Sequence, residues 1–322
     1  MSELLVSVLM PAYNAEKFIE KSIESILHQT YDQFELLILD DCSIDNTYKL
    51  ISQFNDSRIF AQRNEINLGY LKSCNKLFTQ CKGHFITFQD ADDWSDPFRL
   101  EKMVCVFKRQ PHIGLCASNH YWVMDDKVIP GDRISSELNF LRKAIPHHFP
   151  CVGSTVMISR KVLKDVGGYH PFFDRLGGED FEWIARIVDR YDSVIQQDPL
   201  YYYRYNPNSV TNKNLSIATI VMDEILKNGI SQRRNLGKNP FDEWDGKGVQ
   251  LVIMEIGLSR GKISELYRSR AAREIDRNNL PQALFCLKET LRYNLFSFKN
   301  LRTLFYFNRT RMRSAILKGR TK

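Results

Sequence analysis

The sequence lacks paired cysteines, because its seven cysteines are scattered over 322 residues with no C-x-x-C spacing. An odd, dispersed set argues against a disulfide framework and against a zinc site built from thiol pairs. Long hydrophobic runs are also missing: the apolar segment 4–10 stops at Pro11, well short of a membrane span and without the basic flank or cleavage site of a signal peptide. We therefore expect a cytoplasmic protein with reduced thiols.

A glycine-rich phosphate loop is absent as well. The residues after the first apolar segment read PAYNAEKF, whereas a sugar nucleotidyltransferase would need a glycine-rich, basic loop at that point. What is present is a composition of 43% hydrophobic and 26% charged residues, which is typical of a well-buried globular protein. The length indicates one large domain with an appendage, or two domains.

Basic charge is concentrated at the C-terminal end. The net charge is +7, and the segment 298–322 holds eight Lys and Arg residues, no acidic residue, and interleaved aromatic and aliphatic side chains. This pattern favours adsorption to an anionic membrane surface, where each basic side chain near the lipid contributes about 1 kcal/mol. Two alternatives stay open: nucleic acid, for which the sequence has no motif, and an ordinary packed helix with a basic tail.

Strands alternate with helices over the first 110 residues. Apolar segments at 4–10, 34–39, 59–61 and 84–88 are separated by helical periodicity, and Asn14 is expected to cap the first helix. Such alternation predicts right-handed crossovers and a mostly parallel sheet flanked by helices. We therefore expect an α/β domain of a nucleotide-binding type.

The remainder divides into a mixed part and a helical part. A hairpin is expected around Asp125-Asp126, and beyond residue 214 the pattern is helical throughout, with Gly229 expected to end the first helix. Short strands complete the sheet and make it mixed rather than purely parallel, at 113–117, 154–158, 193–197 and 200–205. A boundary near residue 214 follows.

Three carboxylates, those of Asp90, Asp92 and Asp93, follow the predicted strand 84–88 in the segment FITFQDADDWSDP. Like charges this close raise each other's pKa values unless a cation lies among them. A divalent metal that also binds phosphates is the simplest stabiliser, and open α/β sheets bind ligands at such strand ends. The alternative is an acidic surface turn in which Asp96-Pro97 begins a helix.

Three further clusters lie at predicted strand ends or helix starts. Pro11 and Tyr13 follow the first strand and can present backbone groups and a ring to a planar base. Asp40-Asp41 follows the second strand, either as a helix cap or as acceptors for a base N–H or a ribose hydroxyl. Glu179-Asp180 begins a helix, either as a dipole-favoured cap or as a general base. In this order the clusters indicate a nucleotide-diphosphate site.

These segments resemble the family-two glycosyltransferases of the GT-A fold. The resemblance rests on VSVLMPAYNAEKFIEKSIESILHQTYDQFELLILDDCSIDNT, NLGYLKSCNK, GHFITFQDADDW and GGED, and it extends from about Val6 to Thr211. It implies a catalytic domain at 1–214, with a nucleotide-sugar half at about 1–110 and an acceptor half at about 111–214. Residues 215–322 would form a C-terminal all-α appendage with the basic amphipathic tail.

The resemblance also implies roles for individual residues. Asp180 matches the base that deprotonates the acceptor hydroxyl, and its neighbour Glu179 is the less favoured base. Asp92 is the first choice as ligand of Mn²⁺ or Mg²⁺, while Asp90 and Asp93 match metal or ribose-phosphate contacts. Further nucleotide-sugar contacts are expected at Pro11 and Tyr13 beside the base, at Asp41 on the uracil ring, and at Lys72 and Asn75.

Two positions depart from the family pattern. Cys74 stands where many relatives have an arginine before Asn75, so Lys72 is expected to supply the positive charge instead. Asn206 replaces a histidine in the segment YRYNPNS, and no metal or pyrophosphate contact is assigned to it. Arg204 and Ser209 of the same segment stay candidates, with a structural role favoured for both.

The implied reaction moves a sugar from a nucleotide-sugar, with UDP as the expected nucleotide, to an acceptor hydroxyl with inversion. The resemblance and the basic tail favour a lipid-linked oligosaccharide acceptor in O-antigen, capsule or lipooligosaccharide synthesis, and peripheral binding to the inner face of the cell membrane. The alternatives are a polyprenyl-phosphate sugar transferase and, from other classes, a sugar nucleotidyltransferase or a non-catalytic nucleotide-sugar binder. We expect no nucleic-acid partner.

Overall fold

The computed structural model describes residues 4–124, 127–148, 150–205, 216–277, 279–295 and 297–319, with side chains described as far as residue 311. These residues divide into two compact units, one within Met1–Asn206 and Ile230–Phe241 and the other within Pro207–Gly229 and Asp242–Lys322. The predicted hairpin turn at Asp125-Asp126 and the predicted boundary at 214 lie outside the described residues.

A parallel layer forms the first half of the sheet in the first unit. The strands β1 (Val6–Ala12), β2 (Phe34–Asp40), β3 (Ile59–Arg63) and β4 (Phe85–Phe88) lie in the order β3-β2-β1-β4. Every residue of β1, β2 and β4 is buried, as expected of parallel strands covered on both faces. Because these strands run in one direction, their carboxyl ends meet at one edge of the sheet.

The second half of the sheet is mixed. After β4 the order continues β8-β6-β9-β5, and β7 pairs with β6. The bounds are β5 (Trp94–Ser95), β6 (Leu115–Met124), β7 (Lys127–Pro130), β8 (Val156–Ser159) and β9 (Ser193–Arg204). β8 is antiparallel to both β4 and β6, whereas β9 is parallel to β6. The predictions of two strands at 193–197 and 200–205 were wrong, because β9 continues through an irregularity in its pairing with β6 near Asn119.

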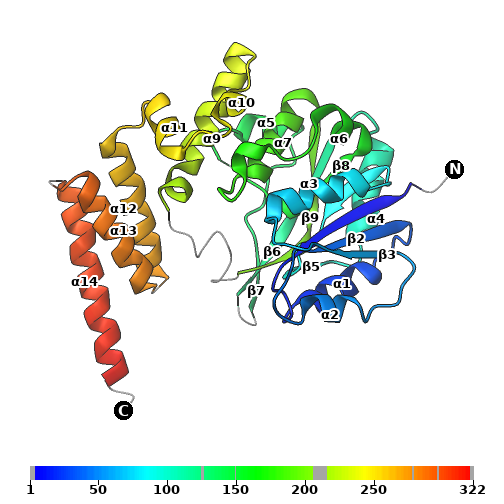
Figure 1. The fold of residues 1–322 in the computed structure, drawn as a ribbon, viewed down its shortest axis with the longest axis horizontal. Coiled ribbons are helices and arrows are strands. Elements are labelled where there is room, and N and C mark those ends of the chain that lie inside the picture. Colours follow the sequence, from blue (N-terminus) through cyan, green and yellow to red (C-terminus); the bar gives the residue numbers. More distant parts are fainter. Residues whose placement is uncertain are drawn as a thin grey trace. The chain divides into compact units, whose positions relative to one another are not determined.

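Helices cover both faces of this sheet. Helix α1 (Ile19–Leu27) turns Ile19, Ile23 and Ile26 into the core, together with the buried stripe of α4 (Arg99–Arg109). Figure 1 shows α1 and α2 (Thr47–Ile51) on one face and α3 (Tyr70–Gln80) on the other. The predicted cap at Asn14 was wrong, because α1 begins five residues later and the Asn14 amide oxygen accepts from Ile44 N instead.

Further elements complete the sheet region of the first unit. They are α5 (Phe140–Ala144), the 3₁₀ turn η1 (Gly153–Thr155), α6 (Arg160–Val166), the 3₁₀ turn η2 (Pro171–Phe173) and α7 (Glu179–Arg190). The predicted fold class is confirmed: a mixed α/β sheet flanked by helices, followed by a helical C-terminal region. None of the described helices is long and apolar enough to cross a membrane.

Helix α9 (Ile217–Leu236) runs through Gly229, so the predicted helix end at that glycine was wrong. A glycine within a helix costs about 1 kcal/mol relative to alanine. Two contacts of the following turns offset this cost: Ile230 is fully buried, and the Arg233 guanidinium lies 2.6 Å from the buried carboxylate of Glu182 in α7. Phe241 then packs on Phe172 and Phe173 of η2. The segment Ile230–Phe241 therefore belongs to the unit that contains the sheet.

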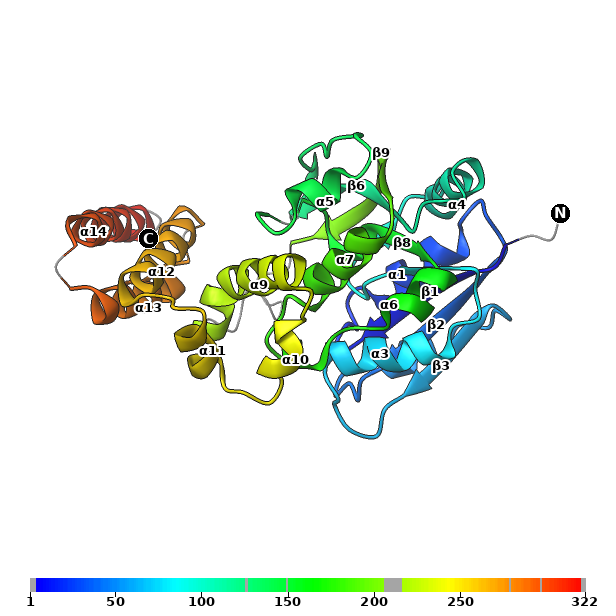
Figure 2. The same cartoon turned by 90° about the horizontal axis from the view of Figure 1, so that it is seen from above.

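The second unit is helical. It contains α9 as far as Gly229, most of α10 (Pro240–Trp244), and then α11 (Val249–Glu255), α12 (Arg260–Asp276), α13 (Leu280–Tyr293) and α14 (Phe298–Gly319). The last three lie side by side in both views (Figures 1 and 2). Asn300 and Phe307 form the buried side of α14, and the amide of Asn300 donates to Ser264 Oγ of α12 over 3.1 Å.

Candidate active site

The residues after β4 form a tight turn at the carboxyl edge of the sheet. Asp93 N donates to the Asp90 carbonyl over 3.2 Å, and Asp90 N donates to the Tyr201 hydroxyl of β9 over 3.0 Å. The Ser154 hydroxyl donates to the Asp90 carboxylate, whose other oxygen lies 3.4 Å from the Tyr70 hydroxyl. The acidic segment is thus held by β9, η1 and α3 rather than extending into solvent.

Crowding of carboxylates dominates the electrostatics of this turn. Burial raises the pKa of Asp90 to about 6, and the nearby charges of Asp92 and Asp180 add to this effect. Burial also raises the pKa of Asp93 well above its ordinary value, with Asp90 and Asp92 contributing. A cation beside these groups would reverse the effect, because an opposite charge favours the ionised form.

The three aspartates have different surroundings. Asp93 is 2% exposed, and its carboxylate accepts from Arg204 N of β9 over 2.7 Å. The Arg204 side chain donates to the Asp92 carbonyl over 2.9 Å, which fixes the backbone of the turn. Because Asp93 is fixed against β9, the partly exposed carboxylates of Asp90 and Asp92 are the better candidates for a metal.

A buried arginine lies behind the acidic turn, and the sequence reasoning missed it. Arg99 in α4 is fully buried and donates to the Phe88 carbonyl over 2.9 Å, to Thr87 Oγ1 over 2.8 Å and to the Ser154 carbonyl over 2.5 Å. Burial lowers the pKa of this guanidinium to about 10, although the charges of Asp90 and other acidic groups oppose the shift. The sequence feature that could have revealed Arg99 is its position on the apolar stripe of a helix that begins directly after the acidic cluster.

Helix α7 brings the second carboxylate pair to the same site. Its first residues are Glu179 and Asp180, and one Asp180 oxygen accepts from Phe181 N over 2.7 Å. Burial raises the pKa of both carboxyls, and in Glu179 the neighbouring charge of Asp180 adds to the effect. Asp180 also raises the pKa of Asp90. The structure therefore brings together the two acidic segments, which are separated by about 90 residues in the chain.

The predicted base-binding residues lie at the ends of β1 and β2. Pro11 is buried within β1, opposite Leu39 of β2, whereas the following Tyr13 is 49% exposed. Asp41 is 3% exposed, and its carboxylate accepts from Asn64 Nδ2, Leu68 N and Gly69 N, each over 2.8 Å. Asp41 thus fixes the loop before α3, and its contact with a uracil ring stays a prediction.

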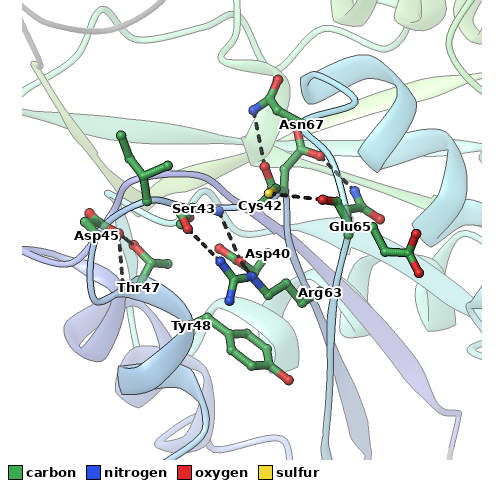
Figure 3. Close-up of polar contacts among 12 residues, drawn as sticks. Asp40, Cys42, Ser43, Asp45, Thr47, Tyr48, Arg63, Glu65 and Asn67 are labelled. Atoms are coloured by element: carbon green, nitrogen blue, oxygen red, sulfur yellow. Dashed lines mark hydrogen bonds and ion pairs between the residues drawn. The ribbon is translucent and has the colours of Figure 1, made fainter.

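Asp40 is held through one of its two carboxylate oxygens. Its carboxylate lies 3.1 Å from Arg63 Nε of β3 and accepts from Ser43 N over 3.2 Å, while Arg63 also donates to the Ser43 carbonyl (Figure 3). The guanidinium lies over the Tyr48 ring at 5.2 Å. The Cys42 thiol also donates to the Glu65 carbonyl, and together these contacts join the loops after β2 and β3.

Helix α3 carries the remaining predicted residues. The Lys72 ammonium lies 2.6 Å from Asp174, and the Asn75 amide exchanges two hydrogen bonds with the backbone of Tyr169, of 2.9 and 2.8 Å. Cys74, which replaces the family arginine, is fully buried. A cation that the sequence reasoning did not single out is Arg175, whose side chain donates to Asn67 beside Lys72.

These side chains provide a limited set of metal ligands. Among the described residues, no three or more His, Cys, Asp or Glu side chains are grouped so that they could hold a metal ion by themselves. Asp90 and Asp92 nevertheless fit a cation whose other ligands come from substrate phosphates and water, the usual arrangement for Mg²⁺. The candidate Ser209 lies outside the described residues, as does Asn206, to which no contact was assigned.

Comparison with known proteins identifies the family. A sequence model described as Glycosyl transferase family 2 matches residues 7–167. The chain belongs to this family. It is also 30% identical over 262 residues to WfgD of Escherichia coli, named UDP-Glc:alpha-D-GlcNAc-diphosphoundecaprenol beta-1,3-glucosyltransferase, covering 77% of this chain and all of WfgD. WfaP of Escherichia coli, which is named for the same activity, is also 30% identical to this chain. That match covers 64% of this chain and 80% of WfaP.

Solved structures agree on the fold. Staphylococcus aureus TarS in complex with UDP-GlcNAc matches with a TM-score of 0.58 and 18% identity, over 90% of this chain and 89% of that one. TarS in complex with UDP matches with a TM-score of 0.54 over the same shares. At this identity the likeness shows the fold, and the family membership shows that the protein is a glycosyltransferase.

Proposed function

We propose that this glycosyltransferase is metal-dependent and inverting, and that Asp180 is its general base. The observation that carries the proposal is the meeting of two acidic segments: Ser154 donates to Asp90, while the adjacent Gly153 lies directly against Asp180. The segment with Asp90 is suited to the leaving diphosphate, and the segment with Asp180 is suited to the attacking hydroxyl. Inverting sugar transfer needs both functions on one reacting carbon.

Asp180 removes the proton of the acceptor hydroxyl as that oxygen attacks the anomeric carbon of the donor. The bond to the diphosphate oxygen breaks in the same step, so an α-linked donor gives a β-glycoside and a free nucleoside diphosphate. A divalent metal held by Asp90 and Asp92 would take up charge on the departing diphosphate. The raised pKa of Asp180 suits proton abstraction, because a carboxylate destabilised by burial is a stronger base.

The names of the relatives support a choice of donor and acceptor. WfgD and WfaP are named for UDP-glucose and for a diphosphoundecaprenol-linked GlcNAc acceptor, and TarS has been solved with UDP-GlcNAc. We propose a UDP-sugar donor and a lipid-linked oligosaccharide acceptor in bacterial surface-glycan synthesis. Tyr13 and Asp41 at the ends of β1 and β2 would face the base.

A test of the base uses two neighbouring carboxylates. Asp180→Asn should reduce transfer by about a thousandfold or more while UDP binding, measured by calorimetry with Mn²⁺, persists. Glu179→Gln is the matched control, since it removes an equally buried carboxyl one residue away, and it should retain most of the turnover. Near-normal turnover of Asp180→Asn would remove Asp180 from the role of base. A screen of UDP-sugars for transfer or hydrolysis would identify the donor.

The exposed face of α14 supports peripheral binding to an anionic membrane. Phe298 and Phe305 are 81% and 73% exposed, Leu301 lies between them on the same face, and Lys299 and Arg302 flank them. Apolar side chains beside basic ones suit the headgroup region of anionic lipids. This surface would bring the enzyme to a lipid-linked acceptor.

The membrane proposal is tested with vesicles. Replacing Phe298, Leu301 and Phe305 by Ser in the full chain should abolish binding to vesicles containing anionic lipid, and salt should weaken the binding of the wild type. Leu251→Ser/Met254→Ser is the control, because these α11 side chains are also strongly exposed. Equal vesicle binding by the wild type and the α14 variant would contradict the proposal.

A further inference from the structure

The 3₁₀ turn η1 lies between the two acidic segments and contacts both. The Ser154 hydroxyl donates to the Asp90 carboxylate on the side of the metal candidate. Ser154 is 5% exposed, so this hydroxyl has few alternative partners in water. A neutral donor on one oxygen of a crowded carboxylate favours its ionised form and also fixes its orientation.

The preceding residue, Gly153, packs against the proposed base. A Cβ atom added at Gly153 would lie 2.9 Å from Asp180 Cβ and still closer to Asp180 Oδ2. Real Cβ atoms do not approach side-chain atoms so closely, so the base carboxylate or the turn would have to move. The backbone of η1 is therefore the surface against which Asp180 rests, and only glycine leaves room for it.

The 3₁₀ turn η1 is itself anchored to β4, the strand that precedes the acidic cluster. The buried Arg99 donates to the Ser154 carbonyl and to Thr87 of β4, while the Thr87 hydroxyl donates to the Val156 carbonyl over 2.7 Å. The Ser154 carbonyl of η1 thus has a buried partner, and the strand β8 that follows η1 is held against β4. With the turn held in this way, a larger residue at position 153 displaces Asp180 rather than η1.

We propose that Gly153 and Ser154 are positioning residues, which hold the acceptor base and the donor-side aspartate at a set separation. This inference rests on the roles proposed above for Asp180 and Asp90. Neither positioning residue needs to contact the substrate. Each acts on a different carboxylate, so their removal should affect different steps of the reaction.

The test is the opposite response of two adjacent residues in the full-length enzyme. Gly153→Ala should lower kcat for transfer by about a hundredfold and leave donor KM unchanged within twofold. A displacement of the catalytic base by about 1 Å is enough to lower the rate by this factor. Ser154→Ala should raise donor KM and weaken Mn²⁺-dependent UDP binding about ten- to a hundredfold, the loss expected for one hydrogen bond to a charged group. Ser154→Thr, which keeps the hydroxyl, should restore donor binding.

Controls separate this inference from the proposed function. Gly248→Ala is the matched glycine variant, because a Cβ there meets nothing within 4 Å, and it should behave like the wild type. If Asp180→Asn and Asp90→Asn abolish transfer while both η1 variants keep kcat and KM within twofold, the positioning role is overturned and the proposed function stands. If Asp180→Asn retains turnover, the proposed function itself fails. Should Gly153→Ala not fold, the KM effect of Ser154→Ala and its restoration by Ser154→Thr decide the matter.

Discussion

Two pairs of aspartates follow buried parallel strands at the same edge of the sheet, and their surroundings are opposite. At the end of β2, Asp40 and Asp41 accept hydrogen bonds from backbone N–H groups and Asn64, and Asp40 also forms an ion pair with Arg63. At the end of β4, Asp90 and Asp93 lie among other carboxylates, which together with burial raise their pKa values. The aspartates at these two strand ends therefore have different roles.

The difference separates a structural acid from a functional one. A carboxylate whose two oxygens both accept from donors, as in Asp41, stabilises the loop around it, as at an N-cap or a tight turn. Carboxylates that are buried together without enough donors cost stability, and such a cost is expected where a cation or substrate will bind. A stability measurement and an activity measurement should therefore rank the two clusters in opposite orders.

The largest expected effect is on catalysis at the end of β4. Asp92→Asn and Asp90→Asn should each lower transfer by about a hundred- to a thousandfold, because charge on the departing diphosphate is no longer balanced. Asp41→Asn should chiefly raise donor KM, by about tenfold or less. Steady-state kinetics with excess Mn²⁺ checks this order, and full activity of the wild type in excess EDTA would contradict a metal role.

The second effect is on stability at the end of β2. Asp41→Asn should lower the free energy of unfolding by about 2–3 kcal/mol, because the amide NH₂ group replaces one of the two acceptor oxygens and leaves either Leu68 N or Gly69 N without its partner. Asp90→Asn should leave stability unchanged or raise it in metal-free buffer. Urea denaturation of the two variants measures this difference. Equal losses in the free energy of unfolding would mean that the aspartates after β2 and β4 contribute alike to stability.

A third effect concerns pH. The folded-state pKa of Asp90, about 6, lies above its ordinary value, so the native state binds protons more readily than the unfolded chain. Metal-free wild type should gain stability as pH falls from about 7 to 5, by about 1 kcal/mol from this group, and lose it as pH rises through 6. Asp90→Asn should flatten this dependence, whereas Asp41→Asn should keep it. Thermal unfolding in EDTA across pH 5–8 distinguishes the two.

The smallest effect is expected at Lys72, whose helix follows the loop that Asp41 holds. Its ion pair with Asp174 is half-exposed, and such pairs contribute about 0–1 kcal/mol. Lys72→Ala should therefore change the free energy of unfolding by less than about 0.5 kcal/mol, yet raise donor KM severalfold if the ammonium also meets the diphosphate. An unchanged KM would leave Lys72 as a surface ion pair, and Arg175→Ala is the companion variant to measure.

The parallel strands and their acidic ends were predictable from sequence, because buried parallel strands appear as continuous apolar runs and their carboxyl ends meet at one edge. The sequence did not separate Asp41 from Asp90, since each simply follows a buried strand. Their difference comes from partners far along the chain, such as Gly69 for Asp41 and Ser154 for Asp90. The burial of Arg99 was hidden for the same reason: its acceptors come from β4 and η1, which local periodicity does not relate to α4.

The segment Ile230–Phe241 has a consequence for biosynthesis. Helix α7 carries the proposed base, and its buried Glu182 obtains the Arg233 counter-charge only from this late segment, while Phe172 and Phe173 are covered by Phe241. A chain emerging from the ribosome therefore cannot finish its catalytic unit until Phe241 has been translated. Until then Glu182 has only Arg186 of its own helix as a counter-charge and two aromatic rings are exposed, which makes the nascent chain a candidate for chaperone binding during synthesis.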